Sequence, residues 1–200
     1  LEGDGRYFDL LRSNSGALGQ VVLDQVFLGE NADESDWQLT TEAGTGSLAK
    51  AFGGLVHTRT LDEVLTSHPA FRSSRLLKID TDGLDTRIQH GARAWLEAAK
   101  PVIFYEFDPD LTRRSGDRIE RSLELLTDIG YDRLLWWDNF GDFIADIRLA
   151  DVSTIEELTA YFSGWGGRRY ADVCVFPPDM TAVRAAVRNV ELKQWAHRSA

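Results

Sequence analysis

Two apolar runs of strand length, each ending in carboxylates, constrain this sequence most. Residues 76–79 are apolar apart from one lysine and are followed by Asp80 and Asp82, and a second run at residues 102–107 contains Glu106 near its end. Such runs are typical of strands buried on both faces of a sheet. In open α/β sheets, ligands bind beyond the carboxyl ends of the strands. The sequence therefore predicts a functional site where these runs end, with Asp80 and Asp82 on one face of an extended backbone.

Further strands and helices alternate along the chain. The predicted strands are residues 21–28, 56–58, 76–80, 102–107, 134–137, 143–147 and 173–176, with only weak strand signals in the polar stretch 29–54. Apolar periodicity and capping signals predict helices near residues 7–11 and at 85–99, 118–128, 153–162 and 179–195. Turn residues at 138–141 predict a hairpin. We expect an α/β fold with a mostly parallel sheet covered on both faces and a terminal antiparallel hairpin.

Capping residues set several expected helix ends. Thr60 and Glu63 have the spacing of a capping box, which predicts a short helix after Thr60, and Ser153 and Glu156 repeat this spacing. Asp179 is expected to cap the last helix. The apolar residues on the buried side of that helix are predicted to be Met180, Val183, Val187 and Val190.

Length, charge and cysteine content limit the class of protein. The 200 residues, 43% of them hydrophobic, suit one domain at 1–178 with a helical extension at 179–200. The net charge of −10 argues against general affinity for nucleic acid or anionic membranes. Cys174 is the only cysteine, and we expect it in a buried strand. Without a secretory-signal pattern or a bilayer-length apolar run, the default expectation is a cytoplasmic protein with no membrane insertion.

Several segments together resemble a known family. They are residues 58–65, residues 77–83, a helix that carries Gly91, and residues 100–107. In this order they are similar to the core signature of the FkbM-type S-adenosylmethionine-dependent methyltransferases, most strongly over residues 56–109. The resemblance implies a Rossmann-like sheet that binds S-adenosylmethionine across the carboxyl ends of its strands.

The resemblance also implies positions for residues around the cofactor. Glu2 matches the acid that binds the ribose hydroxyls, and one carboxylate can accept hydrogen bonds from both hydroxyls of a diol. Gly29 and Glu30 are expected near the adenine, and Asp80 near the methyl-donor end. The resemblance implies no metal.

Asp82 and Glu106 are expected on the side of the methyl acceptor. The methyl group of the cofactor is already activated, so the protein mainly aligns an oxygen nucleophile within about 3 to 3.5 Å of it. Asp80 or Asp82 is expected to accept the proton of that oxygen as general base. The implied partner is a small-molecule acceptor that offers a saccharide or natural-product hydroxyl.

The family's first strand and glycine-rich turn have no counterpart in this sequence. The resemblance places them before Leu1, so we expect this chain to be the carboxyl-terminal part of a longer domain. The strand at 21–28 would then lie beside a gap, with unpaired hydrogen-bonding groups along the edge. We expect this chain alone to bind cofactor poorly or not at all, and a catalytically inactive binding domain is the non-enzyme alternative.

A second enzyme interpretation starts from the same acids. An apolar strand followed by Asp80 and Asp82 is similar to the nucleophile loop of haloacid-dehalogenase-type phosphatases, in which one Asp attacks phosphorus and the next is the general acid. Residues 141–146 are similar to the acidic magnesium motif of these enzymes, whereas Leu84 stands where they carry a hydroxylic residue. Because the phosphatase needs a divalent cation and the methyltransferase does not, metal dependence separates the two.

Overall fold

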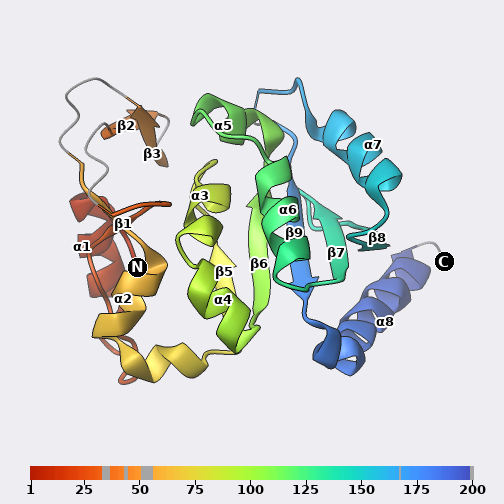
Figure 1. Ribbon diagram of the computed structural model, residues 1–200, viewed down its shortest axis with the longest axis horizontal. Coiled ribbons are helices and arrows are strands. Elements are labelled where there is room, and N and C mark those ends of the chain that lie inside the picture. Colours follow the sequence, from red (N-terminus) through yellow and green to blue (C-terminus); the bar gives the residue numbers. More distant parts are fainter. Residues whose placement is uncertain (33–36, 43–44, 51–55, 167, 199–200) are drawn as a thin grey trace.

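The computed structural model describes residues 1–32, 37–42, 45–50, 56–166 and 168–198. Its strands are β1 (Phe27–Leu28), β2 (Trp37–Glu42), β3 (Thr45–Lys50), β4 (Thr58–Arg59), β5 (Leu76–Ile79), β6 (Val102–Phe107), β7 (Arg133–Asp138), β8 (Phe143–Arg148) and β9 (Ala171–Phe176). Its helices are α1 (Gly5–Ser15), α2 (Leu61–Ser67), α3 (Asp85–His90), α4 (Arg93–Ala99), α5 (Pro109–Arg114), α6 (Glu120–Asp128), α7 (Val152–Phe162) and α8 (Thr181–Arg198), with 3₁₀ turns η1 (Pro69–Ser73) and η2 (Pro178–Met180). Helices and strands alternate along the chain (Figure 1), which confirms the predicted α/β class.

The central sheet has five strands in the order β5-β6-β9-β7-β8. β5 is parallel to β6, whereas β9 is antiparallel to both β6 and β7. The expectation of a mostly parallel sheet is therefore wrong, because β9 inserts between two strands of the same direction, and an apolar pattern reports burial rather than direction. The terminal hairpin of β7 and β8 is confirmed, with the Gly141 N–H donating to the Asp138 carbonyl at 2.9 Å. β5, β6 and β7 run in the same direction, so their carboxyl ends lie at the same end of the sheet.

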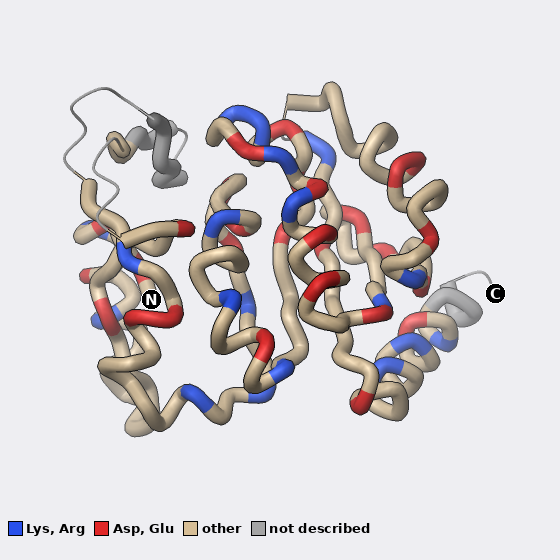
Figure 2. Tube along the Cα trace, viewed as in Figure 1, with Lys and Arg blue, Asp and Glu red and all other residues tan. Residues whose placement is uncertain are grey.

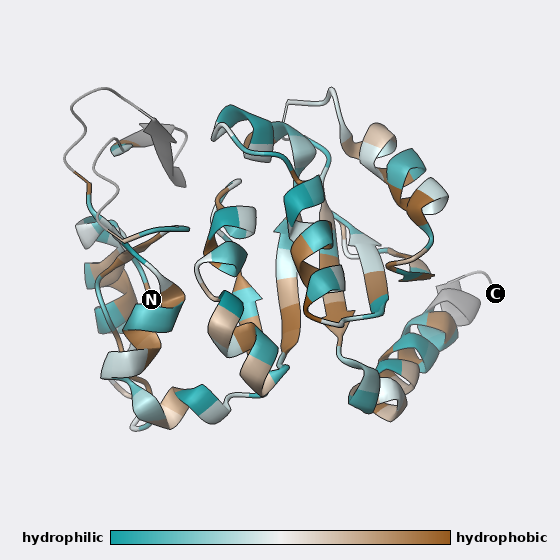
Figure 3. Cartoon of the chain, viewed as in Figure 1, coloured by the Kyte–Doolittle hydropathy of each residue, from teal (hydrophilic) through white to brown (hydrophobic). Residues whose placement is uncertain are grey.

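Apolar side chains cover both faces of this sheet. The larger cluster packs one face against α2, α3, α4, α6 and α7, with Tyr105, Leu134 and Trp136 fully buried. On the other face, a smaller cluster that includes Leu135 packs against η2 and α8. Cys174 belongs to this smaller cluster, as predicted for a buried strand residue. Apolar residues follow the strands and the sheet-facing sides of the helices (Figure 3).

Only part of the predicted apolar side of α8 is buried. Met180 and Val187 pack against the sheet, but Val183 and Val190 are 50% and 52% exposed. The expectation for these two valines is wrong, because the side of α8 that packs against the sheet includes Val187 but neither Val183 nor Val190.

The amino-terminal part makes short pairings of its own. β1 is parallel to β4, Glu2 makes a parallel bridge to Gln25, and β2 pairs with β3 in a hairpin. The strand predicted at 21–28 is reduced to β1 and this bridge, and Val21 and Val22 are exposed. Within the described ranges no strand pairs with these two valines, and a strand needs a neighbour to bond its backbone.

The helix predicted at 85–99 is two helices, α3 and α4, separated at Gly91. A Cβ atom on Gly91 would lie 2.2 Å from the Gly29 carbonyl oxygen, so only glycine permits this close approach. Asp62 of α2 then accepts hydrogen bonds from the N–H groups of Ala94 and Trp95, at 3.0 and 2.9 Å, and starts α4 afresh. The helix is thus divided by two contacts between residues far apart in the sequence, one at Gly29 and one at Asp62.

The capping predictions have mixed outcomes. The Thr60–Glu63 capping box is confirmed, with both hydrogen bonds at 3.1 Å. The second box is wrong, because the Asp151 carboxylate caps α7 instead by accepting from the Thr154 N–H at 3.4 Å. The cap predicted at Asp179 is also wrong, since this residue lies within η2.

Throughout the part of the chain that the structure describes, no helix combines the length and the apolar content that crossing a membrane requires.

Candidate functional site

A cavity of about 340 Å³ opens at the carboxyl end of β5. It brings together three of the predicted site residues, Glu2, Asp80 and Asp82, from distant parts of the sequence. The apolar side chains of its lining are Leu1, Val26, Phe27, Leu28, Leu39, Leu84 and Ile88. A concave, largely apolar site of this size with a few convergent polar groups is typical of small-molecule binding.

The loop after β5 has a backbone that fixes the acids in place. Asp82 has a φ of 51° and Gly83 a φ of 97°, so two consecutive residues adopt left-handed conformations. A Cβ atom on Gly83 would lie 2.6 Å from the Leu111 carbonyl oxygen of α5, which only glycine avoids. Asp80 is exposed and forms an ion pair with Lys78. Burial, and secondly the neighbouring Asp80, raises the pKa of Asp82.

Asp85 is a buried acid next to the cavity that the sequence did not single out, although it does not itself line the cavity. It is 1% exposed, accepts a hydrogen bond from the Thr81 hydroxyl at 2.8 Å, and accepts another from the Glu106 N–H at 3.3 Å. It thereby ties the loop after β5 to the end of β6. Burial raises its pKa to about 6. In the sequence, Asp85 could be noticed only as a further acid five residues after Asp80. That position is equally typical of an acid in the first turn of a helix, and Asp85 is indeed the first residue of α3.

Glu106, a predicted site residue, lies on β6 beside β5 but does not line the cavity. Its pKa is raised further than that of Asp85. Burial, followed by the charge of Asp85, raises its pKa to about 8. Its Oε1 atom is buried and has no hydrogen-bond partner among the residues that the structure describes. Across the sheet it pairs in register with Asp172 of β9, whose pKa is raised by burial and then by Asp80. Adjacent carboxylates repel one another when both are ionised. The pair of Glu106 and Asp172 is therefore stabilised when one of them keeps its proton or when a cationic ligand binds beside them.

Glu2 is held at the other side of the cavity. Its Oε1 atom accepts a hydrogen bond from the Asp4 N–H at 2.8 Å. Asp4 in turn caps α1 by accepting from the Arg6 N–H and pairs with the Arg6 guanidinium at 2.7 Å. The hydrogen bond from the Asp4 N–H therefore orients the Glu2 side chain and uses one of its two carboxylate oxygens.

Gly29 and Glu30, predicted near the adenine, do not line the cavity. Gly29 packs closely on Thr58 and on the backbone at Gly91. The Glu30 carboxylate instead accepts from Arg121 of α6 at 2.7 Å. Phe27 and Leu28, just before these residues, line the cavity in their place.

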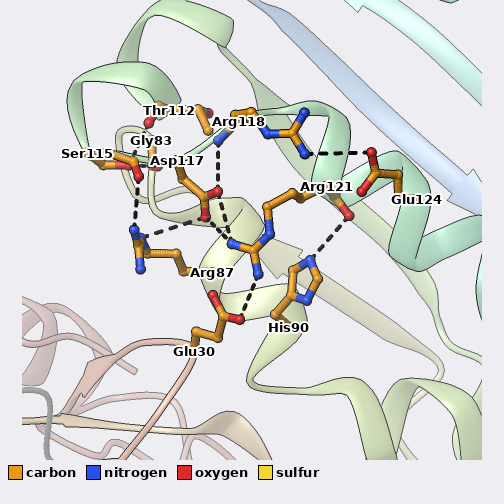
Figure 4. Close-up of polar contacts among 11 residues, drawn as sticks. Glu30, Gly83, Arg87, His90, Thr112, Ser115, Asp117, Arg118, Arg121 and Glu124 are labelled. Atoms are coloured by element: carbon orange, nitrogen blue, oxygen red, sulfur yellow. Dashed lines mark hydrogen bonds and ion pairs between the residues drawn. The ribbon is translucent and has the colours of Figure 1, made fainter.

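A charged network connects Glu30 to the helices above the sheet (Figure 4). Acidic and basic residues lie side by side along α5 and the start of α6 (Figure 2). Arg121 contacts both oxygens of the buried Asp117, at 2.9 and 2.8 Å, and Arg87 of α3 approaches Asp117 at 3.7 Å. The Arg87 guanidinium also lies 5.2 Å from the ring of Trp37 at the start of β2. The network thus fastens the amino-terminal part, which forms one wall of the cavity, to α3 and α6.

Replacing Arg121 with glutamine is expected to lower the free energy of unfolding by about 2–3 kcal/mol, because the buried Asp117 carboxylate loses its main counter-charge. Urea denaturation measures this change. The matched control is Arg118→Gln, since Arg118 is an exposed neighbour that reaches Glu124 only at 3.8 Å. The control should change stability by less than about 0.5 kcal/mol. Equal effects of the two substitutions would show that the network does not stabilise the fold.

The acids of the phosphatase-like motif lie far from Asp80. Asp142 and Asp146 belong to the β7–β8 hairpin, and β8 is at the opposite edge of the sheet from β5. Four strand spacings of about 4.8 Å separate these edges. Arg133 and Arg184 bind Asp146 as ion pairs. The structure therefore does not bring the two halves of that motif together, and its described residues hold no group of three or more potential metal ligands.

Comparison with protein-family models, with curated proteins and with solved structures found no match to this chain.

Proposed function

We propose that this chain contributes to an S-adenosylmethionine-dependent O-methyltransferase that acts on a saccharide or natural-product hydroxyl. The observation that carries the proposal is the cavity at the end of β5, which Glu2, Asp80 and Asp82 line together with apolar side chains. The resemblance of residues 56–109 to the FkbM-type methyltransferases supports the same reaction.

The lining residues fit an adenosine-containing ligand with a positively charged group. Phe27, Leu28 and Leu39 offer apolar contact to a flat base, and the remaining oxygen of Glu2 can accept from a ribose diol. The cofactor, when bound, supplies an activated methyl group on a sulfonium. The carboxylates of Asp80 and Asp82 favour that positive charge.

The proposal places the acceptor hydroxyl next to Glu106, which lies on β6 beside β5 and outside the cavity lining. Glu106 has a pKa of about 8, close to physiological pH, because burial disfavours its ionised form. A carboxyl group with a pKa in this range exchanges protons efficiently near neutrality. We assign Glu106 the general base, with Asp82 accepting hydrogen bonds from neighbouring hydroxyls, and Asp85 as the positioning residue.

Isothermal titration with S-adenosylhomocysteine tests the proposal. We expect binding that does not change when magnesium is added, and a loss of about tenfold in affinity in both Glu2→Gln and Asp80→Asn, because each removes a charged acceptor. Asp128→Asn, at an exposed acid of α6, is the matched control and should bind as the parent does. Absence of binding both by this chain and by a chain extended upstream of Leu1 would contradict the methyltransferase. A magnesium-dependent heat that disappears in Asp80→Asn would favour the phosphatase. Binding without methyl transfer would favour the inactive binding domain.

A further inference from the structure

The end of α7 and the loop that follows it carry two exposed aromatic rings with an arginine stacked against them. The guanidinium carbon of Arg169 lies 3.9 Å from the centre of the Trp165 ring and 5.3 Å from the centre of the Tyr161 ring. Trp165 is 45% exposed and Tyr161 is 54% exposed. Arg114, the last residue of α5, reaches the same loop, because its Nη2 atom lies 3.2 Å from where a Cβ atom on Gly166 would be. We name Arg114, Tyr161, Trp165 and Arg169 the arginine–aromatic patch.

Neither arginine of the patch has an ion-pair partner among the residues that the structure describes. The neighbouring Arg113, by contrast, pairs with Asp110 at 2.8 Å. Stacking on the rings holds the Arg169 guanidinium in one plane, so less side-chain entropy is lost when it binds a ligand. In a chain of net charge −10, a fixed and unpaired guanidinium is a local site for an anion.

Hydrogen bonds attach the loop to the end of β6. The Asp110 carboxylate, in the first turn of α5, accepts from the N–H of Gly164 at 3.0 Å and from the N–H of Gly166 at 2.5 Å. α5 follows directly after β6, and in Figure 1 the loop and α5 lie at the same end of the sheet. The patch is therefore at the end of the sheet where β5 and β6 have their carboxyl ends.

The patch also lies close to the acids at this end of the sheet. Asp172 of β9 pairs in register with Glu106 of β6. Arg169 precedes Asp172 by three residues, so their Cα atoms are at most about 11 Å apart. Burial, and then the charges of Glu106 and Asp172, raise the pKa of Tyr170, so this side chain lies within their electric field. Arginines that bind anions and acids that accept from hydroxyls thus come together at one place.

We propose that the arginine–aromatic patch binds the phosphate of a sugar phosphate monoester, while a hydroxyl of the same sugar meets Glu106. A planar guanidinium matches a phosphate through two parallel hydrogen bonds, and two unpaired arginines balance the two charges of a monoester. A neutral saccharide would leave both arginines unused, and a carboxylate would balance only one of them. That this sugar is the methyl acceptor rests on the function proposed above, whereas its binding to the patch needs no cofactor.

Isothermal titration without cofactor tests this binding, with glucose 1-phosphate, glucose 6-phosphate, glucose and glucuronate as probes. We expect at least one sugar phosphate to bind about tenfold more tightly than glucose and glucuronate, because only a phosphate monoester engages both arginines. Arg169→Gln and Arg114→Gln should each lower the affinity for that sugar phosphate about tenfold. Arg148→Gln, at an exposed arginine that pairs in register with Arg133 at the opposite end of the sheet, is the matched control and should bind as the parent does.

Substitutions of Trp165 separate the stacking from the charge. Trp165→Ala should weaken sugar phosphate binding about fivefold, because Arg169 loses the ring that holds it, and Trp165→Phe should stay within about twofold of the parent. The indole N–H of Trp165, which donates to the Tyr161 carbonyl at 3.0 Å, locates the ligand by NMR. Its resonance should shift when the sugar phosphate is added and stay in place when glucose is added.

Failure of this inference can be told apart from failure of the methyltransferase. Arg169→Gln should bind S-adenosylhomocysteine as the parent does, because Arg169 does not line the 340 Å³ cavity. If the sugar phosphate binds, but S-adenosylhomocysteine binds neither this chain nor one extended upstream, the patch stands and the methyltransferase fails. If neither sugar phosphate binds, if glucuronate binds as tightly, or if Arg169→Gln and Arg148→Gln have equal effects, the inference is overturned.

Discussion

Replacing Trp136 with alanine is expected to lower the free energy of unfolding by about 3–5 kcal/mol. Trp136 is fully buried on β7, where its ring packs edge-on against Phe107 at 4.7 Å and stacks on Phe162 at 6.4 Å between centroids. The substitution removes the contact that joins β6, β7 and α7, and it leaves a cavity that a sheet cannot easily close. For a chain of this size we expect the melting temperature to fall by about 10 °C.

Two further aromatic substitutions test that explanation. Trp136→Phe keeps a ring in the same place and removes an indole N–H that has no hydrogen-bond partner within the described part of the chain, so it should cost less than half as much. Phe140→Ala, at the 83% exposed tip of the β7–β8 hairpin, should change stability by less than about 0.5 kcal/mol. If alanine at 136 costs no more than alanine at 140, the ring of Trp136 does not hold the sheet and α7 together.

Glu106→Gln is expected to make the chain more stable than the parent at alkaline pH. In the folded chain Glu106 keeps its proton up to a pKa of about 8, whereas its ordinary pKa is 4.5. Between these values the folded state holds more protons than the unfolded state, so the free energy of unfolding falls as the pH rises. This contribution is complete below about pH 4.5 and is lost by about pH 8. Glutamine cannot ionise, so the free energy of unfolding of the variant should exceed that of the parent by about 5 kcal/mol at pH 9 and match it near pH 4.

Urea denaturation at a series of pH values measures this difference. Several charged groups lie around Glu106: Asp80, Asp82, Asp85, Asp108, Asp172 and Lys78. Burial also raises the pKa of Asp85, from 3.8 to about 6. In the Glu106→Gln variant the free energy of unfolding should therefore still fall with pH between about 3.8 and 6, but less steeply than in the parent. Glu97→Gln, at an exposed glutamate of α4, is the matched control and should keep the parent's pH dependence. Parallel curves for Glu106→Gln and the parent would show that Glu106 is not buried as a neutral acid.

Local signals predicted those elements whose cause lies within a few residues. The capping box at Thr60 and the turn at 138–141 depend on near neighbours, and both are present. The two apolar runs predicted β5 and β6 with the acids at their ends, and so placed Asp80 and Asp82 at the cavity. The order of residues along one strand was sufficient to place these acids after β5. The burial expected for that strand is only partly right, because Leu76 is 61% exposed.

Features that depend on distant contacts were not predictable in this way. Gly91 divides the helix at 85–99 because the backbone at Gly29 approaches it. Glu30 is directed away from the cavity by Arg121, which lies 91 residues further along the chain. Asp85 acquires its role only when β6 brings Glu106 beside it. The antiparallel direction of β9 follows from the path of the chain after α7, which apolar periodicity does not encode.

The insertion of β9 also governs when the sheet can form during synthesis. β9 is the middle strand of the five, yet it is the last of them to leave the ribosome, and its partners β6 and β7 begin about seventy and forty residues earlier. Until residue 176 has emerged, β5–β6 and β7–β8 can exist only as two separate ribbons with open edges. Pairings of such long sequence separation form slowly. Nascent chains that stall before β9 are therefore the species in which chaperone binding and edge-to-edge aggregation should concentrate.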